Sequence, residues 1–573
     1  MLHSTKRIVS SLLKASPRRS LSSPSGADFA ASVAPMLVKH LREGAELPVV
    51  KLRSPAELQA AFKALGVPLP LADGEAAVNH AGLLEACGAT LEYSVNTASP
   101  LFNNQLYGTA DPVGIAGDWL VAVLNANAHT FEVAPVFTAV ENELMLKMGR
   151  VLGGGYADTT PNGSGVEGLF VPGGSLSNMY ALTMARYRHC PDVKTKGNGA
   201  CPDLVAFTSD ESHYSYKKSC SLLGLGSDNL VAVRTDAKGA MDPAALSDAM
   251  QAAVEQGRKP FFVGATAGST VLGAFDPFNE LSDVVEAFND KQEPGSQKGD
   301  PSVWLHVDGA WGGAAVLSPG QRRLCAGVER ADSFCWNPHK AVGAPLQCAQ
   351  FLSRHPGLLQ ASNGTNAAYL FQPDKENTEM DMGDKTFQCG RKVDSFKLWL
   401  MWKALGDQGL AKRVDHLALL AHYMHARLRD YRDDSGRRCF VPLFEVSFTN
   451  VVFYLLPPSQ RVDNPSKTSS GSSSSSKSQQ FSDLTLGLIE KEASEAEAAA
   501  LRPENLNLEA LKSVAPVVKA RLQNAGLAMI GFQPVKAFPN CWRMVFAGAK
   551  EDEMTEATVD KILDDLVAHA KDL

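Results

Sequence analysis

The segment SVWLHVDGA, residues 302–310, decides the fold class. It is mostly apolar and its one acidic residue, Asp308, stands near the end, as expected of a strand that is buried on both faces. Amphipathic helical patterns separate it from three similar runs. These are DLVAFTS at 203–209, NLVAVRTD at 229–236 and PFFVGATAG at 260–268. The alternation predicts an α/β fold with a mostly parallel sheet covered on both sides, whose ligand lies at the carboxyl ends of the strands.

Composition and charge exclude several classes of protein. The chain has 573 residues, 45% of them hydrophobic, which exceeds one average domain and is enough for a large core. The net charge of −7 is spread over a well-mixed set of charged residues, which argues against a nucleic-acid partner. No apolar run is long enough to span a bilayer. The ten cysteines form no CxxC pairs, so a zinc ribbon or disulfide scaffold is disfavoured and a reducing compartment is indicated.

Two segments differ in composition from the rest. Residues 1–27 are basic and serine-rich and contain no acid, which is typical of an organellar transit peptide for a mitochondrion or plastid. The alternative is a disordered tail on a cytoplasmic protein. The second segment begins with NPSKTSSGSSSSSKSQQ at 464–480 and continues into an acidic, alanine-rich stretch. Residues 462–509 are therefore predicted to form a disordered or partly helical surface insertion.

A glycine-rich turn in FVPGGSLSNMYAL, residues 170–182, indicates a phosphate site. Gly173 and Gly174 permit a tight turn and the close approach of a ligand, and Ser175 or Ser177 can cap the helix that follows. The free amides at a helix N-terminus bind phosphate well. By itself this pattern is more typical of an ordinary helix start, so it needs support from other residues.

Asp308 and Lys340 supply that support. A carboxylate at the end of an apolar strand is costly to bury without a cation. A metal ion beside His306 is one candidate cation, but no further ligands are evident in the sequence, and the protonated nitrogen of a pyridine ring fits better. Lys340 follows another apolar strand in SFCWNPHKAVGAPLQC, residues 333–348, and a desolvated lysine becomes a nucleophile for aldehydes. Pyridoxal phosphate unites these features, and His213 could stack on its ring.

A series of motifs then identifies a family. They are GGSLSNMYA, SHYSYKK, ATAGSTVLGAFDP, HVDGAWGG, ADSFCWNPHK, PLQC, AYLFQ, GDKTFQCGRKVDSFKLWLMWKA and APVVKARL. In this order they closely resemble the group II pyridoxal-phosphate decarboxylases, and within these the branch of glutamate decarboxylase and cysteine sulfinate decarboxylase. The resemblance runs from about residue 95 to the C-terminus, interrupted by the serine-rich insertion.

The resemblance implies a fold type I homodimer with sites at the subunit interface. It predicts an N-terminal segment at 28–130 that contributes to the substrate pocket and the dimer. A large cofactor-binding domain with a mostly parallel sheet is expected at 131–405, and a smaller α+β C-terminal domain at 406–573. No nucleic acid, membrane or metal is expected as a partner.

The family also implies roles for single residues. Lys340 matches the lysine bonded to the cofactor, Asp308 the partner of the pyridine nitrogen and His213 the stacking histidine. Ser175 and Leu176 match the turn that contacts the phosphate. Further cofactor contacts are expected at Gly174, Thr266, Asn337 and His339. The substrate contacts are expected at Gln105, Tyr107, Asn127 and Arg543.

These roles imply α-decarboxylation of an acidic amino acid. Arg543 matches the arginine that binds the distal acid group, and it can do so with two parallel hydrogen bonds. In the family, the position that matches Tyr107 is a small serine in the glutamate enzymes and an aromatic residue in the sulfinate and aspartate branches. The resemblance therefore implies a pocket shortened by the Tyr107 ring, which favours cysteine sulfinate, cysteate or aspartate and the products hypotaurine, taurine or β-alanine. Asn127, in contrast, resembles the glutamate-type residue, so a glutamate decarboxylase that makes GABA is the alternative. Two other classes remain: an aldehyde-forming or transaminating enzyme, and a non-catalytic binding protein.

One position departs from the family pattern. Relatives carry a tyrosine on a mobile loop after YLFQ that delivers a proton to Cα, and here Asn377 occupies that place in YLFQPDKENTEMDMGDK, residues 369–385. An amide has no acidic proton to deliver. His213, a water molecule or a residue of the partner subunit are the candidates to replace it.

Overall fold

The structure is a computed structural model that describes residues 26–74, 76–157, 165–290, 303–365, 367, 371, 374–461, 506–549 and 551–573. By its contacts the chain divides into two compact units, Met1–Asn96 and Thr97–Leu573. The domain boundaries near residues 130 and 405 stay predictions. The proposed transit peptide up to residue 25 and the insertion from 462 to 505 lie outside the described residues.

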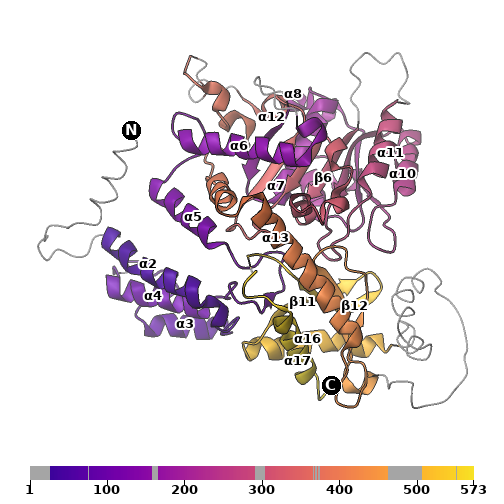
Figure 1. The fold of residues 1–573 in the computed structure, drawn as a ribbon. Helices are drawn as coiled ribbons and strands as arrows, with labels where there is room; N and C mark the ends of the chain where they lie inside the picture. The colour runs from indigo at the N-terminus through magenta and orange to yellow at the C-terminus, as the bar shows by residue number, and fades with distance from the viewer. Residues whose placement is uncertain are drawn as a thin grey trace, which may run out of the picture. The chain divides into compact units, whose positions relative to one another are not determined.

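The described residues of the first unit include the α-helices α2 (Gly26–Glu43), α3 (Pro55–Ala64) and α4 (His80–Tyr93), which Figure 1 shows side by side. Local sequence explains two of the helix starts. Ser54 accepts a hydrogen bond from the Glu57 amide and Glu57 reaches back to the Ser54 amide, a capping box that begins α3. Asn79 caps α4 through the Gly82 amide.

The second unit is built on a seven-stranded sheet with the order β2-β8-β7-β6-β5-β3-β4. Strands β3 to β7 pair in parallel, and β8 alone runs antiparallel to its two neighbours, β2 and β7. The predicted α/β class with a mostly parallel sheet is confirmed. The strands are β2 (Glu167–Val171), β3 (Leu204–Ser209), β4 (Leu230–Val233), β5 (Lys259–Thr266), β6 (Trp304–Gly309), β7 (Ser333–Trp336) and β8 (Ala349–Ser353).

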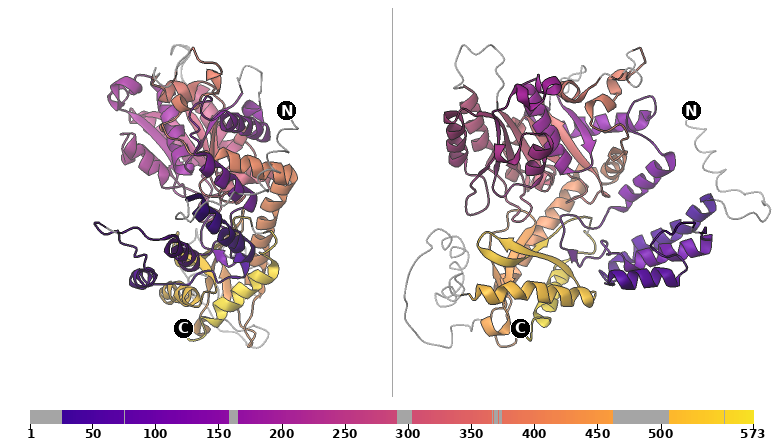
Figure 2. Two further views of the ribbon diagram at one scale, coloured as in Figure 1. Left: turned by 90° about the vertical axis from the view of Figure 1, so that its left-hand side faces the viewer. Right: turned by 180° about the vertical axis from the view of Figure 1, so that it is seen from behind.

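Helices cover both faces of this sheet (Figure 2). Because side chains alternate along a strand, Val205 and Phe207 of β3 join the core on one face and Ala206 joins the core on the other. Helices α6, α10 and α11 pack on the first face, and α7 and α9 on the second. The helices are α5 (Pro112–Leu124), α6 (Pro135–Leu152), α7 (Gly174–His189), α8 (Val193–Lys196), α9 (Ser215–Leu222), α10 (Pro243–Glu255), α11 (Phe278–Asp290) and α12 (Leu358–Asn363).

A second, five-stranded sheet has the order β1-β11-β12-β10-β9. It is antiparallel except that β1 pairs in parallel with β11, so the segment near residue 102 becomes an edge strand of the C-terminal sheet. The strands are β1 (Phe102–Asn103), β9 (Phe440–Pro442), β10 (Asn450–Leu455), β11 (Met529–Val535) and β12 (Phe538–Val545). The associated helices are α13 (Ser395–Asp430), α16 (Leu508–Asn524) and α17 (Glu556–Ala568).

Two further details of this region concern its helices. Helix α13 is interrupted at Gly406, whose φ of 65° only glycine adopts readily, so two helical segments meet there. Helix α16 starts at Leu508 and is capped by Asn507, and Leu506 is buried. The insertion predicted to reach residue 509 therefore ends earlier, because apolar residues just before 509 pack into the core. None of the helices in the described ranges is long and apolar enough to cross a membrane.

Candidate active site

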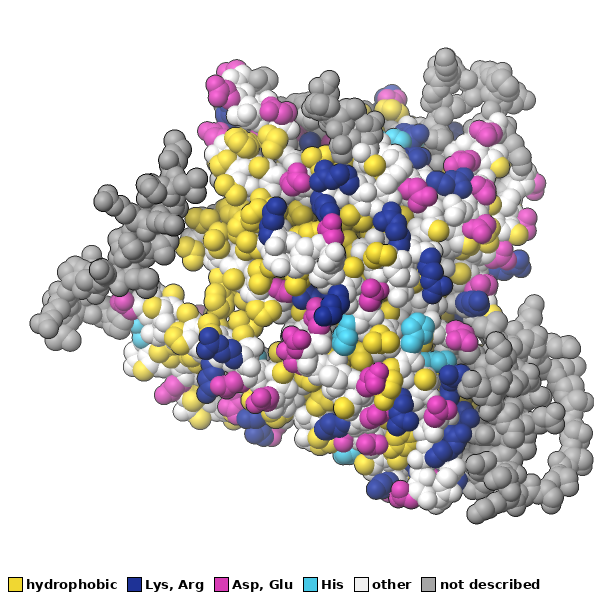
Figure 3. Space-filling view, viewed as in Figure 1, with side chains coloured by type: hydrophobic (Ala, Val, Ile, Leu, Met, Phe, Trp, Pro, Cys, Tyr) yellow, Lys and Arg dark blue, Asp and Glu magenta, His cyan; other side chains and the backbone are white. Residues whose placement is uncertain are grey.

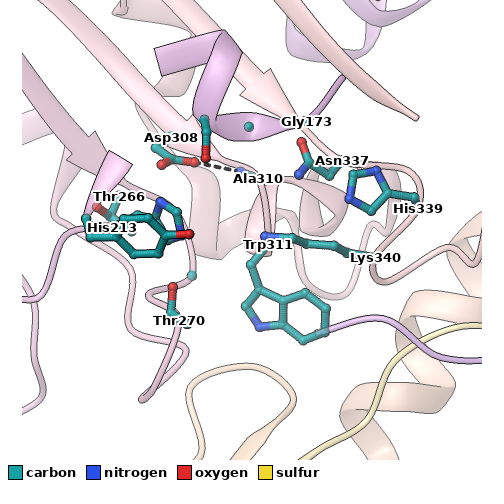
Figure 4. Close-up of a pocket in the computed structure, with 14 residues that line it drawn as sticks. Gly173, His213, Thr266, Thr270, Asp308, Ala310, Trp311, Asn337, His339 and Lys340 are labelled. Carbon is teal, nitrogen blue, oxygen red and sulfur yellow. Dashed lines mark hydrogen bonds between the residues drawn. The ribbon is translucent and has the colours of Figure 1, made fainter. Parts of the chain in front are cut away.

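A cavity of about 240 Å³ lies where β5, β6 and β7 end, in agreement with the expectation for a parallel sheet (Figure 4). Its lining comes from the turn before α7, the loop before α9 and the loops that follow the three strands. The lining residues are Gly173, Gly174, Ser175, His213, Tyr214, Thr266, Gly268, Thr270, Asp308, Ala310, Trp311, Asn337, His339 and Lys340.

Lys340 lies on the connection between β7 and β8. The Lys340 amide donates to the Asn337 carbonyl at 2.9 Å, and His339 Nδ1 accepts from the Cys348 amide at 3.0 Å, so the loop is closed at both ends. Burial lowers the pKa of the Lys340 amine, and the charge of Asp308 partly opposes this shift. The amine is therefore more often neutral than that of a surface lysine, as a nucleophile requires.

Asp308 ends β6 as a buried carboxylate with 5% of its surface exposed. Its Oδ1 accepts from the Ala310 amide at 3.0 Å, and its Oδ2 accepts from Asn178 Nδ2 at 2.6 Å. None of the ion pairs within the described residues includes Asp308. A carboxylate that faces the cavity with hydrogen bonds but no cation can hold a protonated ring nitrogen.

His213 faces the same cavity from the loop after β3 (Figure 4). Its Nδ1 is 2.8 Å from Ser215 Oγ, and its ring centroid lies 4.2 Å from that of Tyr214. Burial lowers the pKa of His213, while the charge of Asp308 raises it by less. The imidazole is consequently neutral near pH 7, and a neutral ring is suited to stacking on a heteroaromatic ligand.

The turn before α7 has the shape of an anion cradle. Gly173 has a φ of 128°, a region that side chains avoid, and a Cβ on Gly174 would stand 2.8 Å from Ala310 Cβ. Across the cavity, Thr266 Oγ1 is buried without a hydrogen-bond partner among the described atoms. An orphaned hydroxyl, an unpaired carboxylate and open helix amides at one cavity fit a ligand with a phosphate and a polar ring.

The predicted substrate residues divide into two groups. Arg543 is 9% exposed, and its two terminal nitrogens donate to the carbonyls of Thr270, at 3.1 Å, and Asn104, at 2.9 Å. Thr270 lines the cavity, so Arg543 stands at its edge with Nε unpartnered among the described groups. Neither Gln105 nor Tyr107 is among the residues that line the cavity. Gln105 follows Asn104 in the chain, and the ring centroid of Tyr107 lies 5.8 Å from that of Phe102 on β1.

Asn127 does not reach the cavity of its own chain. Its Oδ1 accepts from the Arg391 amide at 2.7 Å, and its Nδ2 is 3.5 Å from the Cys389 carbonyl. Leu176 also lies outside the lining, one residue beyond Ser175. His306, weighed as a metal ligand, has both ring nitrogens occupied, by Ser333 and Asn178. No cluster of three side chains able to hold a metal occurs in the portion of the chain that the structure describes.

The residues that sequence reasoning missed are Tyr214, Gly268, Thr270, Ala310 and Trp311. Most of them follow directly after β5 or β6, so the rule that ligands bind at the carboxyl ends of strands could have found them. The indole of Trp311 also donates to Asn450 Oδ1 at 2.7 Å, which ties the cavity wall to β10.

Fold and cavity together define a fold type I enzyme that uses pyridoxal phosphate. Residues 68–456 match the model of the pyridoxal-dependent decarboxylase conserved domain. The chain therefore belongs to the pyridoxal-dependent decarboxylase family and is a carboxy-lyase that acts on an amino acid. The resemblance to the group II enzymes of the glutamate and cysteine sulfinate branch is confirmed, and the reading as a non-catalytic binding protein is wrong.

Three solved structures resemble the chain. It is similar to mouse CSAD with 35% identity and a TM-score of 0.79, over 95% of this chain and 98% of that one. Oryza sativa TDC with PLP and tryptamine has 21% identity and a TM-score of 0.75, over 97% and 99% of the two chains. Rhodiola rosea 4-hydroxyphenylacetaldehyde synthase has 20% identity and a TM-score of 0.69, over 95% and 97%. The last two share the fold.

Proposed function

We propose that this enzyme removes the α-carboxylate of an acidic amino acid and prefers cysteine sulfinate, cysteate or aspartate to glutamate. The observation that carries the proposal is Arg543, a buried guanidinium at the edge of the cavity whose bonds to the protein go to carbonyl oxygens. A buried cation that has no carboxylate partner favours an anionic ligand. The 35% identity with mouse CSAD supports the same choice.

In this proposal the cofactor is held by residues from four loops. Lys340 would hold its aldehyde, Asp308 would pair with its ring nitrogen, and His213 would pack against the ring face. In the turn at Ser175 and Leu176 the phosphate would be bound at Ser175, because the Leu176 amide already donates to the Gly173 carbonyl at 3.0 Å. The remaining contacts come from Gly174, Thr266, Asn337 and His339. Bound pyridoxal phosphate supplies a ring that accepts the electron pair left when the bond from Cα to its carboxylate breaks.

The protein then decides which bond breaks by orienting the substrate. Arg543 would fix the distal acid group of the substrate, and this would limit the orientation of its α-carboxylate toward the bound cofactor. Tyr107 sets the distance between these two points. A bulky ring shortens the pocket and excludes a side chain with one more methylene, as in glutamate.

The experiment compares kcat/KM for cysteine sulfinate, cysteate, aspartate and glutamate. The three shorter acids should exceed glutamate, and Tyr107→Ser should raise the relative kcat/KM for glutamate because it lengthens the pocket. Tyr93→Ser, in α4 of the other compact unit, is the matched control. A wild-type preference for glutamate would overturn the substrate proposal and favour the alternative, a glutamate decarboxylase that makes GABA. An aldehyde product in place of an amine would favour the aldehyde-forming alternative.

We also propose a homodimer in which the partner completes the site. Helix α5 exposes a row of large apolar side chains, Val113, Trp119, Leu120, Val123 and Leu124, and Val123 is 85% exposed. Figure 3 shows hydrophobic side chains gathered over this side of the second unit. A patch of this kind marks an association surface. Asn127, which follows α5, would then serve the cavity of the partner chain. Light scattering should give a dimer, and Val123→Asp should weaken it.

For location, we propose import into a mitochondrion or plastid, directed by residues 1–27. The support is the basic, acid-free composition of that segment. A fusion of residues 1–27 to a fluorescent protein should accumulate in one of these organelles. Uniform cytoplasmic fluorescence would favour the alternative, a tail without a targeting role.

A further inference from the structure

Behind the cavity, a chain of buried polar groups converges on Asn178 of α7. Asn178 is 0% exposed and does not line the cavity. Its Nδ2 donates to Asp308 Oδ2 at 2.6 Å and to Ser215 Oγ at 2.9 Å. Its Oδ1 faces His306 Nε2 at 3.0 Å. One amide therefore contacts the carboxylate of the cavity floor, the serine beside His213 and a buried histidine.

The direction of these hydrogen bonds follows from their chemistry. The Asp308 carboxylate can only accept hydrogen bonds, so the Asn178 amide nitrogen faces it and Asn178 Oδ1 faces His306 Nε2. An amide oxygen also only accepts, so His306 Nε2 carries a proton and donates to it. Burial lowers the pKa of His306 to about 4, so the ring is neutral and its Nδ1 accepts from the Ser333 hydroxyl, 2.8 Å away. The indole N–H of Trp304 donates to the same Ser333 oxygen at 2.8 Å.

The second branch leads to His213. The Ser215 amide donates to His213 Nδ1 at 3.3 Å, so this nitrogen is an acceptor, and the Ser215 hydroxyl, which accepts from Asn178, can donate to it at 2.8 Å. With two donors on Nδ1, the proton of neutral His213 is on Nε2. The orientation of Asn178 thus fixes the hydrogen-bond state of two groups that face the cavity.

We propose that Asn178 is a positioning residue that holds Asp308 as a carboxylate for the ring nitrogen and, through Ser215, fixes the tautomer of His213. Asparagine can donate twice and accept once from this position. Aspartate lacks the donors, and leucine lacks every polar contact. Asn178 thereby links the binding of the ring nitrogen to the packing of the ring face, through groups that never touch the cofactor.

Other titratable groups face this network and bear on its pH dependence. Burial raises the pKa of the Cys335 thiol, whose Sγ is 3.6 Å from Asp308 Oδ1, and raises that of the Tyr216 phenol. Both therefore stay neutral. The charge of Lys340 lowers the pKa of His213, and the charge of Asp308 raises the pKa of Lys340. In wild-type protein, cofactor affinity is thus expected to change little between mildly acidic and mildly basic pH through this network.

The test compares Asn178→Asp with Asn178→Leu, and both with Asn198→Asp as a matched control. Asn198 Nδ2 donates to the Leu223 carbonyl at 2.7 Å and does not line the cavity. The dissociation constant of pyridoxal phosphate is measured against pH by equilibrium dialysis. Asn178→Leu should raise it at least about tenfold at every pH, because a hydrogen bond to a charged group is lost. Asn178→Asp should approach the wild-type value as pH falls, when the new carboxyl is protonated and can donate to Asp308.

Parallel curves for the two variants, or wild-type affinity in both, would overturn the proposal. If neither variant folds, the Ser215→Ala variant tests the proposed coupling between Asn178 and His213 instead. In the cofactor-free protein labelled with ¹⁵N-histidine, this change should leave the nitrogen shifts of His306 in place and move those of His213 toward a mixture of tautomers. Unchanged shifts of His213 would show that the coupling through Ser215 does not exist.

Discussion

Replacing Arg543 with leucine should abolish most of the preference for acidic substrates while the cofactor still binds. The guanidinium is 9% exposed, so a substrate acid that meets it is largely desolvated. Removing one partner of such a buried pair costs about 2–5 kcal/mol, since the remaining charge keeps its desolvation penalty. At about 1.36 kcal/mol for each factor of ten, kcat/KM should fall by about 30-fold to several thousand-fold.

The assay is CO2 release from cysteine sulfinate, with the visible absorbance of the bound cofactor recorded in parallel. Arg521→Leu is the matched control, because Arg521 pairs with Asp572 at the surface, away from the cavity. Arg543→Lys keeps the charge but offers one point of contact, and should fall between wild type and Arg543→Leu. A kcat/KM within about threefold of wild type in Arg543→Leu would refute the role given to Arg543.

Three further predictions concern the cofactor lysine, a buried ion pair and the proton donor. In cofactor-free protein, Lys340 should react with amine reagents at lower pH than exposed lysines do, because burial lowers its pKa. The Asp308 carboxylate raises that pKa, so Asp308→Asn should extend the reactivity of Lys340 to still lower pH. Equal reactivity of all lysines by peptide mass spectrometry would contradict this prediction. Arg391 and Glu141 pair at 2.6 Å with side-chain exposures of 2% and 1%, so Arg391→Leu should cost about 3–5 kcal/mol and the double change with Glu141→Gln distinctly less. Calorimetry should show the double variant melting above the single one, and the reverse order would contradict this. Because Asn377 cannot deliver a proton, the rate of turnover should decay during the reaction and recover on addition of pyridoxal phosphate. Asn377→Tyr should lessen this decay. Linear turnover without added cofactor would show that another acid delivers the proton to Cα.

The sequence was most informative where one local pattern decides the structure. The runs around Val205, Phe262 and Val307 became parallel strands because a continuous apolar run fits a strand covered on both faces. Asp308 and Lys340 could be predicted as site residues because Asp308 lies near the end of such a strand, Lys340 lies in the loop after one, and both would be costly to bury without a ligand.

The parts that escaped prediction depend on contacts between distant residues. Asn178 lies on a helix whose hydropathy pattern does not mark it as a functional residue. Its hydrogen-bond partners Ser215 and Asp308 are 37 and 130 positions away in the sequence. The antiparallel direction of β8 is set by its pairing with β2, nearly two hundred residues earlier. Asn127 was expected at the cavity, yet its amide holds Arg391. No periodicity within a short window carries such information.

The two sheets divide the work of the enzyme into separately changeable parts. The residues proposed to hold the cofactor, among them Asp308 on β6 and Lys340 on the connection from β7 to β8, belong to the seven-stranded sheet and its loops. The proposed substrate residue Arg543 lies on β12, and β1, which ends at Asn103 before Tyr107, pairs with β11 in the same small sheet. This separation suggests how the substrate preference of the enzyme can be redesigned. Residues of β1, β11 and β12 can be exchanged together, as a cassette, to select a new amino acid while the catalytic chemistry on the large sheet is left untouched.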